Sequence, residues 1–264
     1  MRKLAFGSIA LLALTARAAT ASDLPPPAPA PVYRPSVVAP VFSWSGCYAG
    51  GNVGGGWANT HAYDTNGVLT GAAGAPVLNG DLGSQTASGV IGGGQIGCDY
   101  QIDKLVVGVQ GMFDGSGMSA STAQPGGLFT TDTSILWFGT LTARAGLAVL
   151  PTGLLYVKGG AAWMKDNFSA TVTPTGAALL GAPAGVAANV GFNASGWTIG
   201  GGFEWAFANA WSAFAEYDYL DFGTPSVNFA SPGTLLPTTF PLSVRQNVSV
   251  FMVGLNARFG PAGY

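Results

Sequence analysis

Residues 136–150 read LWFGTLTARAGLAVL, an almost entirely apolar stretch with one permanent cation near its middle. Trp137, Leu141 and Leu147 occupy positions of the same parity. Arg144 has the opposite parity, which it shares with two threonines. Because successive side chains of a β-strand point to opposite faces, this pattern predicts a strand with one apolar face and one face that carries the arginine.

The same alternation recurs in eight segments whose length and aromatic content are typical of membrane-crossing strands. The segments cover residues 44–57, 90–101, 105–114, 136–150, 154–164, 196–207, 211–221 and 248–259. Their polar residues share one face, so we expect the other face to meet hydrocarbon. Five tryptophans are interpreted as lipid-facing or interfacial residues: Trp44, Trp57, Trp163, Trp197 and Trp205.

The connections between these segments are alternately long and short. The long ones cover about 58–85, 115–133, 165–194 and 222–243, and the short ones are QIDK (101–104), LPTG (150–153) and ANA (208–210). Bacterial outer-membrane barrels alternate in this way between outer loops and periplasmic turns. Since hydrocarbon offers no partner to unpaired backbone groups, the sheet must close. The predicted fold class is therefore all-β, an eight-stranded antiparallel transmembrane β-barrel with both chain ends in the periplasm.

Seven charged residues have the inward parity of Arg144 and are expected inside this narrow barrel. They are Asp114, Arg144, Lys158, Glu204, Glu216, Asp218 and Arg258. Buried charges must be paired, so the first hypothesis is a network that neutralises itself, fills the interior and locks the barrel. The second is a gate, whose ion pairs exchange partners and open a narrow water path. Acid–base catalysis would need a substrate cleft that a packed interior lacks, and no enzymatic activity is predicted.

The remaining composition fits a secreted membrane protein. Only 8% of the residues are charged, and the mean hydropathy is +0.36. The start MRKLAFGSIALLALTARAATA predicts a signal peptide over 1–21. Residues 22–42 are proline-rich and predict a stiff periplasmic tail, which leaves 43–264 for the barrel. Beyond the signal peptide seven Lys/Arg face twelve Asp/Glu, so there is no basic patch for nucleic acid.

The two cysteines, Cys47 and Cys98, are too few for a disulfide framework. Each may sit on one of two neighbouring predicted strands, and whether they form a bridge stays open.

The single histidine, His61, lies in the first long connection beside Asp64. A zinc site or a hydrolase triad would need further partners at defined positions, so we predict no metal site. Gly92, Gly94 and Gly97 match the G-x-G-x-x-G pattern of dinucleotide sites. That pattern requires a helix beginning within it, whereas here a predicted strand runs through it.

Five stretches resemble the small outer-membrane β-barrel proteins of alphaproteobacteria: FSWSGCYAGGNVGGGW, GVIGGGQIGCDYQ, WFGTLTARAG, AEYDYLDFG and VGLNARFG. Members of this family are called porin-family or outer-membrane immunogenic proteins and have an OmpA-like barrel. The resemblance covers about 42–260 and implies a major envelope protein in contact with lipopolysaccharide. Some relatives are described as haemin binders. Members commonly end on an aromatic signal read by the barrel assembly machinery, whereas here Phe259 is followed by GPAGY.

We therefore expect a non-enzymatic protein of the cell outer membrane, without a cofactor, that supports the envelope and displays its outer loops. One alternative is a small porin-like channel for ions or small solutes. The other is a surface haem-binding protein, with His61 as ligand and Tyr63, Phe129 and Phe168 as stacking residues. The expected partners are outer-membrane lipids, lipopolysaccharide and the assembly machinery. The proline-rich tail is long enough to extend to peptidoglycan.

Overall fold

The computed structural model describes residues 42–64, 80–123, 127, 129–180, 183–230 and 239–259. They belong to one compact unit, Ala39–Tyr264. The predicted signal peptide, the proline-rich tail apart from Phe42, and the GPAGY extension lie outside the described residues. No helix in the described part of the chain has the length and hydropathy needed to cross a membrane.

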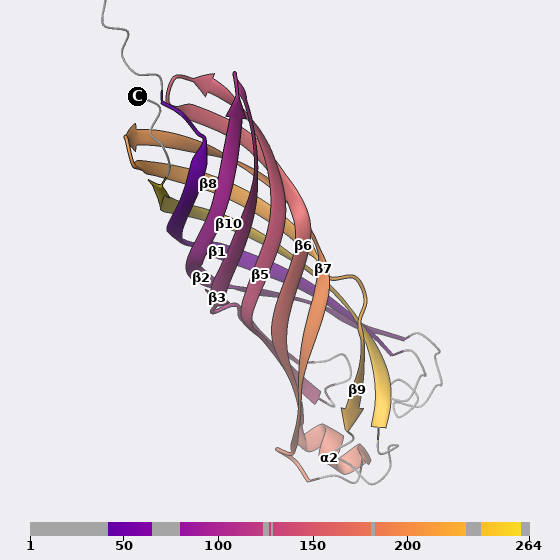
Figure 1. Ribbon diagram of the computed structural model, residues 1–264. Coiled ribbons are helices and arrows are strands. Elements are labelled where there is room, and N and C mark those ends of the chain that lie inside the picture. The colour runs from indigo at the N-terminus through magenta and orange to yellow at the C-terminus, as the bar shows by residue number, and fades with distance from the viewer. Residues whose placement is uncertain are drawn as a thin grey trace, which may run out of the picture. The chain divides into compact units, whose positions relative to one another are not determined.

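Long antiparallel strands carry the fold (Figure 1). They are β1 (Gly46–Asp64), β2 (Gly80–Ile102), β3 (Leu105–Ser116), β5 (Phe129–Leu150), β6 (Gly153–Val172), β7 (Ala187–Ala208), β8 (Trp211–Asp221) and β10 (Thr239–Phe259). Each contains one of the eight segments that the alternating pattern marks, apart from two residues before β1. The eight predicted strands are thus confirmed. Alternation of apolar and polar residues is a direct signal for a strand that has one apolar face.

These strands form a closed ring in the order β1-β10-β8-β7-β6-β5-β3-β2, and β2 pairs with β1 again. The pairing of the first strand with the last places Cys47 opposite Phe259. Two short strands extend the ring: β4 (Ser119–Ala123) pairs with β2 and β5, and β9 (Ser226–Ala230) pairs with β10. The predicted eight-stranded antiparallel barrel is confirmed.

The two ends of the barrel differ. At the turn end, β2–β3, β5–β6 and β7–β8 are joined by the two-residue turns 103–104, 151–152 and 209–210. Asp103 has a φ of 54°, a left-handed conformation that Asp tolerates better than most residues. At the opposite loop end lie β4, β9 and the short helix α2 (Pro174–Leu180) (Figure 1).

The strands continue well beyond the predicted membrane-crossing segments. β2, for example, has 23 residues, whereas about 9–11 residues cross a membrane. Parts of the four connections predicted as long loops are therefore strand. Outward-facing residues of these extensions, such as Asn59 and Thr86, are polar, so the hydrophobic pattern ends before the hydrogen-bonded ladder does.

The outer face is apolar along the middle of the strands. Val53, Ile96 and Val157 each expose 60% or more of their surface. Trp57, Trp163, Trp197 and Trp205 are also exposed, by 42–53%. The interpretation of Trp44 as a lipid-facing residue was wrong, because this side chain is 0% exposed. Trp44 lies two residues before Gly46, which has a φ of 135° and is the first residue of β1.

The interior contains two apolar clusters with charged residues between them. The turn-end cluster consists of Trp44, Val106, Leu154, Tyr156 and Ala206. The larger cluster lies toward the loop end and includes Phe138, Met164 and Met252. Along β5, Arg144 lies between Ala148 and Phe138, and along β6, Lys158 lies between Leu154 and Met164.

Inward glycines make room for the large interior side chains. A Cβ on Gly97 would lie 2.5 Å from the hydroxyl of Tyr48, and one on Gly202 would lie 2.8 Å from that of Tyr156. Both tyrosines are buried against the charged residues. A larger residue at either glycine would therefore displace part of the interior packing.

Candidate functional site: the charged interior

Four charged side chains from four strands form a closed ring inside the barrel. Arg144 (β5) contacts Asp99 (β2) through Nε at 3.0 Å and Glu204 (β7) through Nη2 at 2.8 Å. Arg258 (β10) contacts the same two carboxylates, at 3.1 Å and 3.0 Å. Positive and negative groups alternate around this ring, so each cation has two anionic neighbours.

Two aromatic rings pack against the Arg144 guanidinium. Its Cζ lies 5.2 Å from the ring centroid of Tyr48 and 4.5 Å from that of Tyr156. Nη1 also donates to the Tyr48 hydroxyl at 3.1 Å. The negative faces of the rings favour the cation. Arg144 is only 3% exposed, which accounts for a permanent cation in an apolar stretch.

Neutral side chains complete the bonding of Glu204, which is 0% exposed. Ser212 Oγ donates to its Oε1 at 2.6 Å, and Asn256 Nδ2 donates at 3.0 Å. Gln95 in turn donates to Asn256 Oδ1 at 2.7 Å. Such supporting bonds fix the carboxylate in one orientation, as a buried charge requires.

A second group surrounds Lys158. Its Nζ donates to Glu216 Oε1, lies 2.8 Å from Asp218 Oδ2, and donates to Gln110 Oε1 at 3.2 Å. Tyr156 donates its hydroxyl proton to Glu216 Oε2 at 2.6 Å. The two groups therefore meet at Tyr156, whose ring packs on Arg144 while its hydroxyl binds Glu216.

All seven residues singled out from the sequence point into the barrel. Six of them form the ion pairs just described, whereas Asp114 is 0% exposed and forms no ion pair with any described residue. Asp99 was missing from the predicted set. It has the same parity as Gln95 on β2, so the strand pattern already contained the signal that could have found it.

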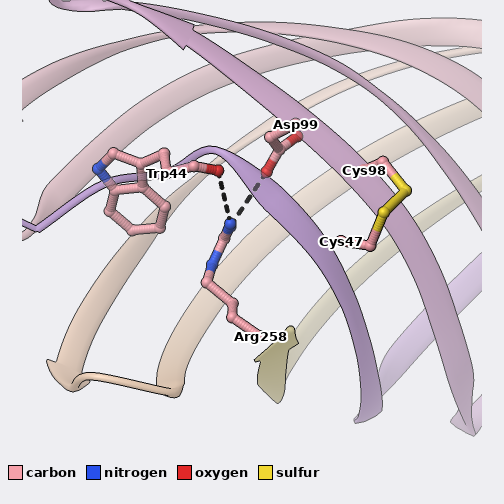
Figure 2. The surroundings of a disulfide bond; sticks show 5 residues. All are labelled: Trp44, Cys47, Cys98, Asp99 and Arg258. Atoms are coloured by element: carbon pink, nitrogen blue, oxygen red, sulfur yellow. Dashed lines mark hydrogen bonds and ion pairs between the residues drawn. A yellow bond between two sulfur atoms is a disulfide. The ribbon is translucent and has the colours of Figure 1, made fainter. Parts of the chain in front are cut away.

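At the turn end of the interior, Arg258 points toward the Trp44 backbone (Figure 2). Arg258 Nη1 donates to the Trp44 carbonyl oxygen at 3.0 Å, and its Cζ lies 4.6 Å from the Trp44 ring. The Trp44 amide donates to Gln101 Oε1 at 2.7 Å. The residues that precede β1 thus fold into the barrel mouth.

The open question of the cysteines is answered by a disulfide between Cys47 and Cys98, which lie directly opposite each other on β1 and β2. Figure 2 shows it beside the ion pair of Asp99 and Arg258. Both cysteines are exposed on the outer face, near the turn end. The bridge covalently fixes the register of the first hairpin.

The weaker sequence signals lie apart from this interior. His61 is on β1 and its ring stacks on Tyr63, with centroids 4.5 Å apart and planes 5° apart. Phe168, expected in a loop, is buried on β6 at 6% exposure, while the Phe129 side chain lies outside the description. The three glycines of the G-x-G-x-x-G match lie within strand β2, so they form no helix-capping phosphate loop.

Comparison with known proteins agrees with this architecture. The family profile described as "outer membrane protein beta-barrel domain" matches residues 6–259. The 31 kDa outer-membrane immunogenic proteins of Brucella melitensis biotype 1 and Brucella suis biovar 1 are each 31% identical over 267 residues, which cover 98% of this chain and all of theirs.

Solved structures similar to this chain include OprG of Pseudomonas aeruginosa, with 16% identity and a TM-score of 0.46, covering 81% of this chain and 96% of that one. Another is Ail of Yersinia pestis, with 13% identity and a TM-score of 0.37, covering 81% of this chain and 99% of that one.

Proposed function

Because the chain belongs to the outer membrane protein β-barrel family, we propose that it is a non-enzymatic, closed barrel that supports the outer membrane and displays its loop end at the cell surface. Its outer face would contact membrane lipids, including lipopolysaccharide in the outer leaflet. The protein is located in the outer membrane.

The observation that carries the proposal is the packed interior. The side chains of Arg144 and Glu204 are 1% and 0% exposed, and both Lys158 and Glu216 are 0% exposed. Burial to this degree is expected of a packed interior rather than of a continuous water-filled path. Apolar clusters lie on both sides along β5 and β6, so an ion would have to cross two apolar layers as well as a paired charge network.

Planar-bilayer recording tests the closed interior. We expect folded protein to give no stable unitary steps. Glu216→Ala, which removes one of the two anionic partners of Lys158 within the same packed layers, should remain silent as well. Stable steps in the wild type that change size in Glu216→Ala would contradict the proposal and favour the channel. A porin reconstituted in the same lipid serves as the positive control.

Surface display is tested by cysteine labelling of intact cells under non-reducing conditions, where the native cysteines remain bridged. Ala178→Cys in α2 at the loop end should react with a membrane-impermeant maleimide. Asn209→Cys, in the exposed turn after β7, should react only after the cells are broken. The reverse pattern would overturn the proposed orientation.

The proposal gives His61 no ligand role. Titration of the folded protein with haem should leave the absorbance of haem unchanged from that in empty micelles. A spectral change that His61→Ala abolishes would instead favour the surface haem-binding protein.

A further inference from the structure

A second polar layer lies inside the barrel toward the loop end, separate from the charged interior. Thr60, Gln85 and Gln246 lie in one row across β1, β2 and β10, because Thr60 is the register partner of both glutamines. Asp166 reaches this row from β6, where Gln246 Nε2 donates to its Oδ2 at 2.7 Å. Gln85 also donates to Thr133 Oγ1 on β5.

Apolar rows enclose this polar layer from both sides. On the side of the charged interior, Ala87, Ala58 and Val248 form the next inward row, and all three are buried. On the side of the loop end, Ala62 and Val244 are register partners and are also buried. The layer is thus a polar band within an otherwise apolar stretch.

Four oxygen atoms of this layer are buried and have no hydrogen-bond partner among the described residues: Thr60 Oγ1, Gln85 Oε1, Asp166 Oδ1 and Gln246 Oε1. Asp166 is 1% exposed and Gln246 is 0% exposed. Buried polar atoms are normally satisfied, so a group of unsatisfied acceptors in one layer indicates a missing donor or cation.

The charge of the layer points in the same direction. Burial raises the pKa of the Asp166 carboxyl above its usual range, whereas hydrogen bonds from Gln246 and from the backbone N–H groups of Ser134 and Asn167 act in the opposite direction. Within the described ranges Asp166 forms no ion pair, although a buried carboxylate needs a positive partner.

We propose that this layer binds a hard divalent cation of the external medium, coordinated by Asp166, Gln246, Gln85 and Thr60 together with water. Carboxylate, amide and hydroxyl oxygens are the donors that Ca²⁺ takes in proteins. With a single carboxylate the affinity falls in the range of extracellular calcium modules, with a Kd of roughly 10⁻⁴–10⁻³ M. The inference goes beyond the proposed function, since a closed barrel needs no metal.

Calcium titration of the folded protein in detergent tests the site, read by equilibrium dialysis and by the thermal unfolding midpoint. We expect saturable binding of one Ca²⁺ and a midpoint that is higher in Ca²⁺ than in EDTA. Asp166→Asn keeps the shape of the side chain and should weaken binding roughly tenfold or more. Gln246→Leu should weaken it too.

Asp132→Asn is the matched control, because Asp132 lies nearby on β5 but faces outward. It should bind Ca²⁺ as the wild type does. Binding that is absent in the wild type, or equally strong in Asp166→Asn, would overturn the proposal and indicate that ordered water alone satisfies the oxygens. Either result leaves the bilayer-silence test of the proposed function unaffected.

Discussion

At the scale of single residues, the replacement of Arg144 should lower the free energy of unfolding strongly. Arg144 bridges Asp99 and Glu204 and packs against two tyrosines. Arg144→Met preserves much of the volume but leaves both carboxylates with Arg258 alone. We expect a loss of about 3–5 kcal/mol in the free energy of unfolding, the usual cost of breaking a buried ion pair from one side. Denaturant unfolding in micelles measures it.

Arg245→Met makes the same exchange at an exposed residue of β10 and serves as the control. Its effect should stay below about 1 kcal/mol, since exposed charges contribute little. Equal losses in the two variants would mean that the interior ion pairs do not stabilise the barrel.

At the scale of elements, the sequence of the β1–β2 hairpin specifies its strand register only weakly, and a disulfide fixes that register. Glycine-rich strands are prone to register slippage, and GGNVGGG (50–56) here pairs with GVIGGGQ (89–95). The disulfide closes a chain segment with a sequence separation of 51, for which chain entropy alone predicts about 4 kcal/mol of stabilisation. We expect Cys47→Ser with Cys98→Ser to lower the free energy of unfolding by about 2–4 kcal/mol.

The measurement is denaturant unfolding of the oxidised wild type, with the wild type in reductant as the control. The reduced protein should match the double variant if the covalent bond is responsible. A double variant as stable as the oxidised protein would show that the strand ladder fixes the register unaided.

The sequence predicted the elements better than their ends, for a physical reason. Alternation records which face meets an apolar phase, so it located all eight strands and the inward parity of Arg144 and Lys158. The alternation weakens where the outward face becomes polar, as at Asn59 and Thr86, so the strand extensions were missed. Trp44 was misplaced because it precedes β1, where alternation no longer applies. Parity also cannot tell which inward charges form ion pairs: Asp99 pairs with Arg144, whereas the buried Asp114 pairs with no described residue.

At the scale of the whole molecule, the barrel separates its tryptophans into an outer set and one interior residue. The chain has seven tryptophans, and Trp44 is fully buried in the turn-end cluster. Trp205, by contrast, is 53% exposed on the outer face. In a barrel inserted in lipid, most of the tryptophan emission should therefore come from residues that acyl chains contact. One component should come from a residue that they do not contact.

Lipids brominated on their acyl chains test this separation, because bromine quenches tryptophan only at close contact. Trp205→Phe should reduce the quenchable fraction of the emission, whereas Trp44→Phe should raise it by removing the protected component. The two variants exchange the same residue types at the same end of the barrel, so each serves as the other's control. If Trp44→Phe lowered the quenchable fraction, Trp44 would face lipid. The turn end of the interior would then lack the side chain that fills it, and this would contradict the proposed closed interior.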